Sequence, residues 1–191
     1  MKTITLFFVL SSLALCHVCA QVVKDPLLTY YQSFDNPSKI PSNTKIYCIS
    51  TDLTGNGKKA ILITNDLARL GPHGDYGWSA YVPVKTGGYS VLDDTIDAPI
   101  TGPDYIGYIK EIKRFGMVTG GKDAVVAQYV DNGSINVQQI DEKRGHADAE
   151  HYPKYFGDGV PDYHVTMYTL VQLEQKYATP DPDNVITPAS K

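Results

Sequence analysis

The chain has 191 residues, of which 42% are hydrophobic, and its formal net charge at pH 7 is −4. This size suits one domain with a sizeable core, and the acidic balance argues against general electrostatic binding of nucleic acid or anionic lipid. After the first twenty residues no apolar run approaches the roughly 20 residues that a transmembrane helix needs.

The first twenty residues have the features of a secretory signal. Lys2 gives a basic start, residues 4–15 are mostly apolar, and Val18 and Ala20 are small residues at the expected cleavage positions. This pattern predicts cleavage after Ala20 and a secreted or periplasmic protein. Because Lys2 leaves with the signal, the formal net charge would become −5.

Two further expectations concern the ends of the chain. The alternative to cleavage after Ala20 is a lipoprotein anchored at Cys16, although Leu15 stands where lipoprotein signals have a small residue. At the other end, residues 179–191 are rich in proline and poor in apolar side chains. We therefore expect a signal at 1–20, one domain at 21–178 and a flexible tail at 179–191.

A helix is predicted at each end of the domain, with strands between them. Asp25 suits an N-cap and Pro26 the first helical position, which predicts a helix over 26–34. Leu170, Leu173 and Tyr177 have helical spacing, which predicts a helix over about 169–177. Alternating or continuous apolar runs of strand length predict eight strands, at about 45–51, 58–64, 77–84, 89–93, 105–112, 114–119, 123–131 and 134–140.

Turn signals between these runs indicate antiparallel neighbours. Asn132-Gly133 lies between two strand-like runs and is the strongest hairpin signal in the chain. The fold class predicted is mainly β with short helices (α+β), with two antiparallel, meander or blade-like sheets over 45–93 and 105–140. The sheets would form a sandwich or an open barrel, and the terminal helices would cover one open edge or end.

The most distinctive local motif runs from Asp52 to Thr64, DLTGNGKKAILIT. It resembles the signature of FG-GAP and VCBS-type repeats, which are extracellular β-repeats whose polar loop links two strands and often holds Ca²⁺. The resemblance covers residues 46–64, and as a whole the chain is similar to small uncharacterised secreted bacterial proteins with one such motif. It implies that Asp52, Thr54 and Asn56 occupy the liganding positions.

Two interpretations of this loop follow. Because Asp52 is the one carboxylate of the set, a Ca²⁺ site here would be weak, with a dissociation constant of about 10⁻⁴–10⁻³ M. In the other interpretation, Asp52 caps backbone amides of an ordinary turn. A second polar loop, at 157–162, has two aspartates and leaves the same pair of interpretations open.

Aromatic residues suggest a contact surface for a partner. The chain has 14 tyrosines and one tryptophan, and many of the tyrosines lie at alternate strand positions. Trp78 and Tyr81 are the residues we expect at a sugar or peptide site, since such rings concentrate at binding hot spots. The alternative is that these rings pack in the sheet.

Residue patterns for catalysis are weak. There is no G-x-S-x-G nucleophile motif, Cys48 lies in an apolar strand, and His146 and His151 are five apart, which one helical face presents poorly to zinc. The sequence therefore predicts a secreted, non-enzymatic binding or interaction module with a protein or glycan partner. The alternatives are an envelope hydrolase with a site assembled from distant residues, and an enzyme inhibitor that uses the loop 66–77.

Overall fold

The computed structural model describes residues 22–34, 36, 39–70, 74–120, 124–142 and 163–178, and only the main chain of 141 and 142. The expected signal and tail, the polar loop 157–162, and both His146 and His151 lie outside these ranges. Within them, no helix is both long and apolar enough to cross a membrane.

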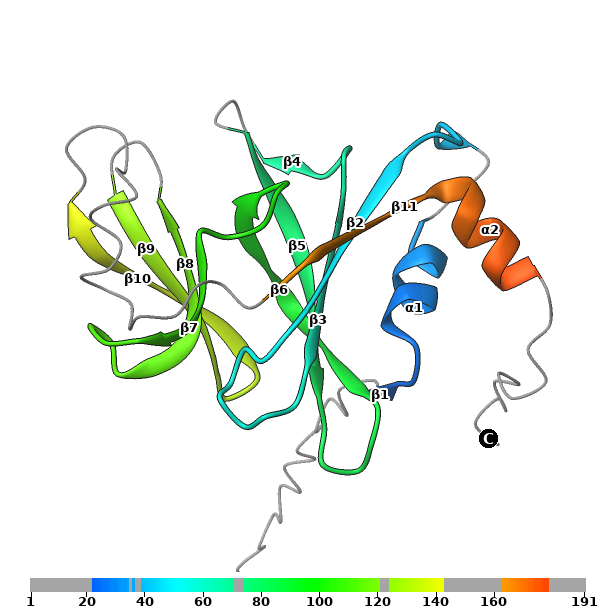
Figure 1. Cartoon of the computed structure of the whole chain (residues 1–191). Coiled ribbons are helices and arrows are strands. Elements are labelled where there is room, and N and C mark those ends of the chain that lie inside the picture. Colours follow the sequence, from blue (N-terminus) through cyan, green and yellow to red (C-terminus); the bar gives the residue numbers. More distant parts are fainter. Residues whose placement is uncertain are drawn as a thin grey trace, which may run out of the picture.

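The larger sheet, sheet A, contains strands from both ends of the domain (Figure 1). Its strand order is β1-β6-β5-β3-β2-β11, with the short β4 paired to β5, and all the pairs are antiparallel. The strands are β1 (Val22–Val23), β2 (Lys45–Thr51), β3 (Ala60–Asn65), β4 (Arg69–Leu70), β5 (Asp75–Pro83), β6 (Tyr89–Pro99) and β11 (Val165–Thr169).

The smaller sheet, sheet B, is a four-strand antiparallel meander in the order β10-β9-β8-β7. Its strands are β7 (Tyr105–Ile109), β8 (Arg114–Gly120), β9 (Ala124–Asp131) and β10 (Ser134–Glu142). Asn132 and Gly133 connect β9 to β10 with φ values of 51° and 82°. Positive φ at both central residues is what a tight two-residue hairpin requires, so the predicted turn is confirmed.

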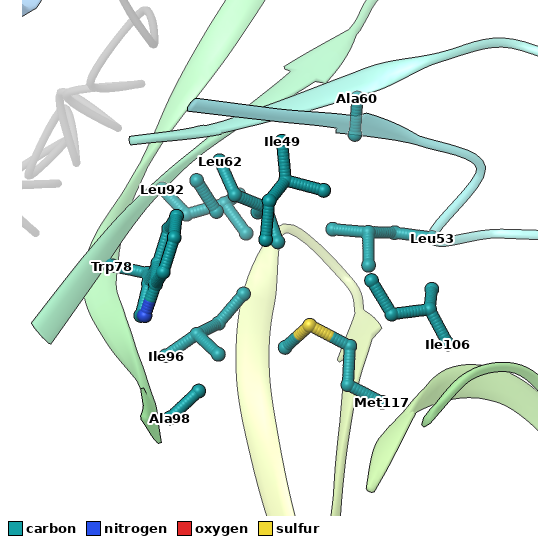
Figure 2. Close-up of a cluster of buried hydrophobic side chains, with 11 residues drawn as sticks. Ile49, Leu53, Ala60, Leu62, Trp78, Leu92, Ile96, Ala98, Ile106 and Met117 are labelled. Carbon is teal, nitrogen blue, oxygen red and sulfur yellow. The ribbon is translucent and has the colours of Figure 1, made fainter. Parts of the chain in front are cut away.

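The main core lies between the two sheets. Figure 2 shows apolar side chains of sheet A, among them Ile49, Leu62 and Trp78, facing Ile106 and Met117 of sheet B. Trp78 is completely buried, and its indole nitrogen donates to the carbonyl of Pro99 at 3.3 Å. The predicted mainly β fold with two antiparallel sheets is confirmed, and the sheets pack around a shared core.

The two helices cover the opposite face of sheet A. Helices α1 (Pro26–Gln32) and α2 (Leu170–Ala178) both lie on that side of the sheet (Figure 1). They pack against it through an apolar cluster that includes Leu27, Leu173 and Ile63. Leu62 and Ile63 are neighbours in β3, yet they enter different clusters because successive strand residues point to opposite faces. Sheet A thus has two apolar faces, and the helices bury one of them instead of covering an edge or end as expected.

Differences from the predicted strands occur mainly at strand ends. The strand predicted at 89–93 continues to Pro99, and the one predicted at 105–112 ends at Ile109. Strands β1, β4 and β11 were not predicted. Sheet B has a further apolar cluster on its face away from the main core, which includes Ile109, Val118 and Ala127.

Candidate functional site

The loop between β2 and β3 is organised around the side chain of Asp52. Its Oδ1 accepts hydrogen bonds from the backbone N–H groups of Thr54 at 3.0 Å and Gly55 at 2.8 Å. Its Oδ2 accepts one from Gly57 at 2.7 Å. Asn56 adds a smaller turn, since its Oδ1 accepts from the N–H of Lys58 at 2.8 Å. Both carboxylate oxygens of Asp52 therefore stabilise the turn, as the turn-capping interpretation predicts.

These bonds also set the charge state of the loop. Burial raises the pKa of Asp52, but the hydrogen bonds from backbone N–H groups of the turn outweigh it and leave the pKa below its ordinary value. The three expected ligands, Asp52, Thr54 and Asn56, lie on one short turn, so a cation at Asp52 would compete with the amides that hold that turn. Among the described residues, no group of three or more His, Cys, Asp or Glu side chains is placed to hold a metal ion.

The two aromatic residues expected at a ligand site are core residues. Trp78 is 0% exposed and Tyr81 is 3% exposed. They also lie on opposite faces of sheet A, because Trp78 belongs to the cluster between the sheets and Tyr81 to the cluster beneath the helices. The structure does not bring these rings together on a surface, and we do not retain them as a binding pair.

A different pair of rings is exposed, at one end of sheet B. Tyr108 of β7 and Phe115 of β8 are direct cross-strand partners. Their ring centroids are 5.6 Å apart at an interplanar angle of 65°, an edge-to-face arrangement that aromatic pairs favour. Tyr108 is 44% exposed and Phe115 is 36% exposed, so both residues are in part accessible to solvent.

The Asp52 turn packs directly on Phe115, one ring of this pair. Gly55 has a φ of 71°, and a Cβ at this position would overlap the ring of Phe115. Only glycine lets the backbone approach the ring so closely at this φ. The hydrogen bonds from backbone N–H groups to the Asp52 carboxylate therefore fix the loop that rests against Phe115.

The neighbouring strand adds polar contacts at the same end. Arg114 lies over the ring of Tyr129 at 5.4 Å and forms an ion pair with Asp131 at 3.4 Å. We call the surface formed by Asp52–Lys59, Tyr108–Phe115 and Tyr129–Gly133 the aromatic tip. It joins one loop of sheet A to two hairpin ends of sheet B.

The pairing of Tyr108 with Phe115 was not predicted, because the strand that contains Tyr108 was expected to end three residues too late. If the strand continued to residue 112, only residue 113 would connect it to the next strand. Such a hairpin would not place Tyr108 opposite Phe115. The structure ends β7 at Ile109, which leaves a four-residue connection and pairs the two rings. The register of a hairpin follows from the length of its loop, so this error in the boundary hid the pair.

Cys48 has the properties expected of an inert thiol. It is partly buried on the helix-covered face of sheet A. Burial raises its pKa to about 11, with nearby Lys176 lowering it and Asp25 raising it by smaller amounts. The thiol thus stays protonated near neutral pH, where a nucleophile would need the thiolate.

Comparison with protein-family models, with curated proteins and with solved structures gives no match.

Proposed function

We propose that this chain is a secreted, non-enzymatic binding module that contacts a protein partner through the aromatic tip. The observation that carries the proposal is the exposed Tyr108–Phe115 pair. Aromatic side chains supply much of the energy at protein interfaces, where they act as anchors in pockets of the partner. Covering two adjacent, partly exposed rings with a partner's apolar surface would remove further apolar area from water and favour binding.

The support beneath the pair favours binding. Asp52 holds its loop with three backbone hydrogen bonds, and Gly55 of that loop rests on Phe115. A surface that is already ordered loses less conformational entropy when a partner binds. The aromatic tip therefore has both an apolar anchor and a preformed shape.

A second candidate surface lies in the loop expected for an enzyme inhibitor. Leu67 and Leu70, within residues 66–77, are 58% and 42% exposed. They provide an apolar contact at a different place in the fold, beside the short β4 that pairs with β5. Any test of the aromatic tip should therefore include this loop as its comparison.

The proposed secretion rests on the N-terminal pattern that ends at Ala20. N-terminal sequencing of protein recovered outside the producing cytoplasm should begin at or near Gln21. A mature protein that begins with a lipid-modified Cys16 would contradict this and indicate a membrane anchor instead.

Site-specific photo-cross-linking tests the contact surface. Tyr108 is replaced by p-benzoylphenylalanine in the secreting cell, and a second strain carries the same replacement at Leu67. We expect a discrete protein adduct from position 108 and none from position 67. An adduct from position 67 alone would move the contact to the 66–77 loop, and no adduct from position 108 would contradict the proposal.

A further inference from the structure

The aromatic tip differs in charge from the rest of the chain. It holds five of the 17 Lys and Arg residues but only three of the 21 Asp and Glu residues. Its formal net charge is therefore +2, although the whole chain has a formal net charge of −4. This asymmetry makes the aromatic tip positively charged on a chain that is acidic as a whole.

Four lysines of the aromatic tip are available to a partner. Lys58, Lys59, Lys110 and Lys113 are all exposed. The ion pair between Arg114 and Asp131 involves none of these four lysines, and none of them lies within ion-pair distance of a described carboxylate.

The acidic residues of the tip offset this positive charge only in part. Both oxygens of Asp52 accept backbone hydrogen bonds, and Asp131 pairs with Arg114. Glu111 remains as an exposed carboxylate beside the lysines of the β7–β8 connection. The charged groups of the aromatic tip that are free to meet a partner are thus mainly lysine ammonium groups.

We infer that the partner presents an acidic protein segment with an apolar side chain among its carboxylates. This inference rests on the proposed function and specifies the chemistry of the partner. The apolar side chain would pack on Tyr108 and Phe115, and the carboxylates would meet the surrounding lysines. Complementary charge of this kind speeds association and selects among partners that share the same apolar contact.

The geometry favours a protein segment over a long polyanion. Nucleic-acid strands are bound by rings on which successive flat groups stack, whereas Tyr108 and Phe115 meet edge to face at 65°. An edge-to-face pair offers a small apolar surface and no flat platform for stacking, which suits a pocket in a protein. The acidic charge of the remaining chain would also repel an extended polyanion that reached beyond the tip.

Selection from a library of random displayed peptides tests this inference, with the mature full-length domain as the immobilised target. The probes are the enriched peptides themselves, synthesised with their acidic residues intact and with those residues changed to Gln or Asn. Binding is measured by fluorescence polarisation to the wild type, to Tyr108→Ser, to Lys110→Glu/Lys113→Glu, and to a matched control. The control is Lys24→Glu/Lys39→Glu, which changes exposed lysines next to α1.

We expect enriched peptides with net negative charge that lose affinity about tenfold or more for both Tyr108→Ser and Lys110→Glu/Lys113→Glu. The control should retain the affinity of the wild type. Neutralising the peptide, or raising NaCl from about 50 to 300 mM, should weaken binding to the wild type by a similar factor. Melting curves verify that each variant is folded, and Tyr108→Phe should retain binding because the ring remains.

Three other outcomes would overturn the acidic-partner inference, the proposed function, or both. Neutral peptides that depend on Tyr108 but not on the lysines would overturn the acidic-partner inference and leave the proposed function standing. Peptides that ignore Tyr108, or no enrichment at all, would contradict both. Heparin or single-stranded DNA that binds through the same lysines more tightly than any peptide would replace the protein partner with a polyanion.

Discussion

The side-chain amide of Gln128 on β9 pairs with the main chain of Asp97 on β6. The N–H of Asp97 donates to Oε1 of Gln128 at 3.0 Å, and Nε2 of Gln128 donates to the carbonyl of Asp97 at 2.6 Å. Among the described residues, β1 pairs with β6 at Tyr89 and Ser90, and no other strand pairs with this edge of β6 near Asp97. Gln128 occupies part of that edge with a side chain and links sheet A to sheet B.

Removing this link should destabilise the domain. Gln128 is 3% exposed, and Gln128→Ala would leave both main-chain groups of Asp97 without this partner. We expect the free energy of unfolding to fall by about 2 kcal/mol, measured by urea denaturation. Gln139→Ala, at an exposed position on β10, is the control and should change it by less than about 0.5 kcal/mol. Equal effects of the two changes would show that the link contributes nothing.

The Asp52 turn should be sensitive to the loss of either carboxylate oxygen. Asp52→Ala removes three backbone hydrogen bonds and should cost about 1–2 kcal/mol in the free energy of unfolding. Asp52→Asn keeps one oxygen acceptor and should cost about half as much. Addition of Ca²⁺ should shift the melting temperature no more than the same concentration of Mg²⁺. A Ca²⁺-specific rise that disappears in Asp52→Asn would show that the loop binds the cation after all.

The lowered pKa of Asp52 also predicts a dependence of stability on pH. A carboxylate whose pKa is lower in the folded than in the unfolded state stabilises the fold above the unfolded pKa of about 4. That stabilisation is lost as the pH falls from about 4 through the folded-state pKa. The difference in unfolding free energy between wild type and Asp52→Asn should therefore shrink over this range. A difference that stays constant down to about pH 2 would contradict the assignment.

The contact between Gly55 and Phe115 can be isolated by a pair of glycine substitutions. Gly55 and Gly57 both have positive φ, but a Cβ at Gly57 would meet nothing within 4 Å. Gly57→Ala should cost about 1 kcal/mol from backbone strain alone, and Gly55→Ala should cost clearly more. In a Phe115→Ala background, the cost of Gly55→Ala should fall toward that of Gly57→Ala, as measured by thermal unfolding. An unchanged cost would mean that the loop and the ring are not in contact.

A second carboxylate joins the two ends of the domain. The Oδ1 of Asp25 accepts hydrogen bonds from the backbone N–H groups of Leu27 and Leu28. Its Oδ2 accepts a hydrogen bond from the hydroxyl of Tyr177 at 3.0 Å. Tyr177→Phe should cost about 1 kcal/mol, and Asp25→Ala about 2 kcal/mol because it also removes the cap of α1. Tyr31→Phe serves as the control, since the Tyr31 ring stacks on Tyr177. If Asp25→Ala costs no more than Tyr177→Phe, the cap contributes no stability.

Local signals predicted the parts of the fold that depend on neighbouring residues. The turn at Asn132-Gly133 and the cap at Asp25 each act over a few residues, and both occur as expected. Strand β11 was missed because its partner β2 lies more than a hundred residues earlier in the chain. Its short sequence VTMYT has no turn signal that would bring it there.

The candidate site was harder to predict because exposure depends on tertiary packing. Trp78 and Tyr81 have the residue types of a binding surface, but two packed sheets and two helices bury them. Tyr108 and Phe115 have the same chemistry and remain exposed because they lie at one end of sheet B. Composition identifies aromatic residues but does not show which of them the fold leaves uncovered.

Hydroxyl-radical footprinting tests the central claim most directly, because it reports the exposure of individual side chains with and without the partner. Oxidation of Tyr108 and Phe115 is measured by mass spectrometry in the purified domain and in the same domain mixed with an extract of the producing cells, with Leu67 as the internal reference. Both rings should oxidise readily in the purified domain and become protected about threefold or more in the mixture, while Leu67 stays unchanged. Protection of Leu67 without protection of Tyr108 and Phe115 would contradict the account.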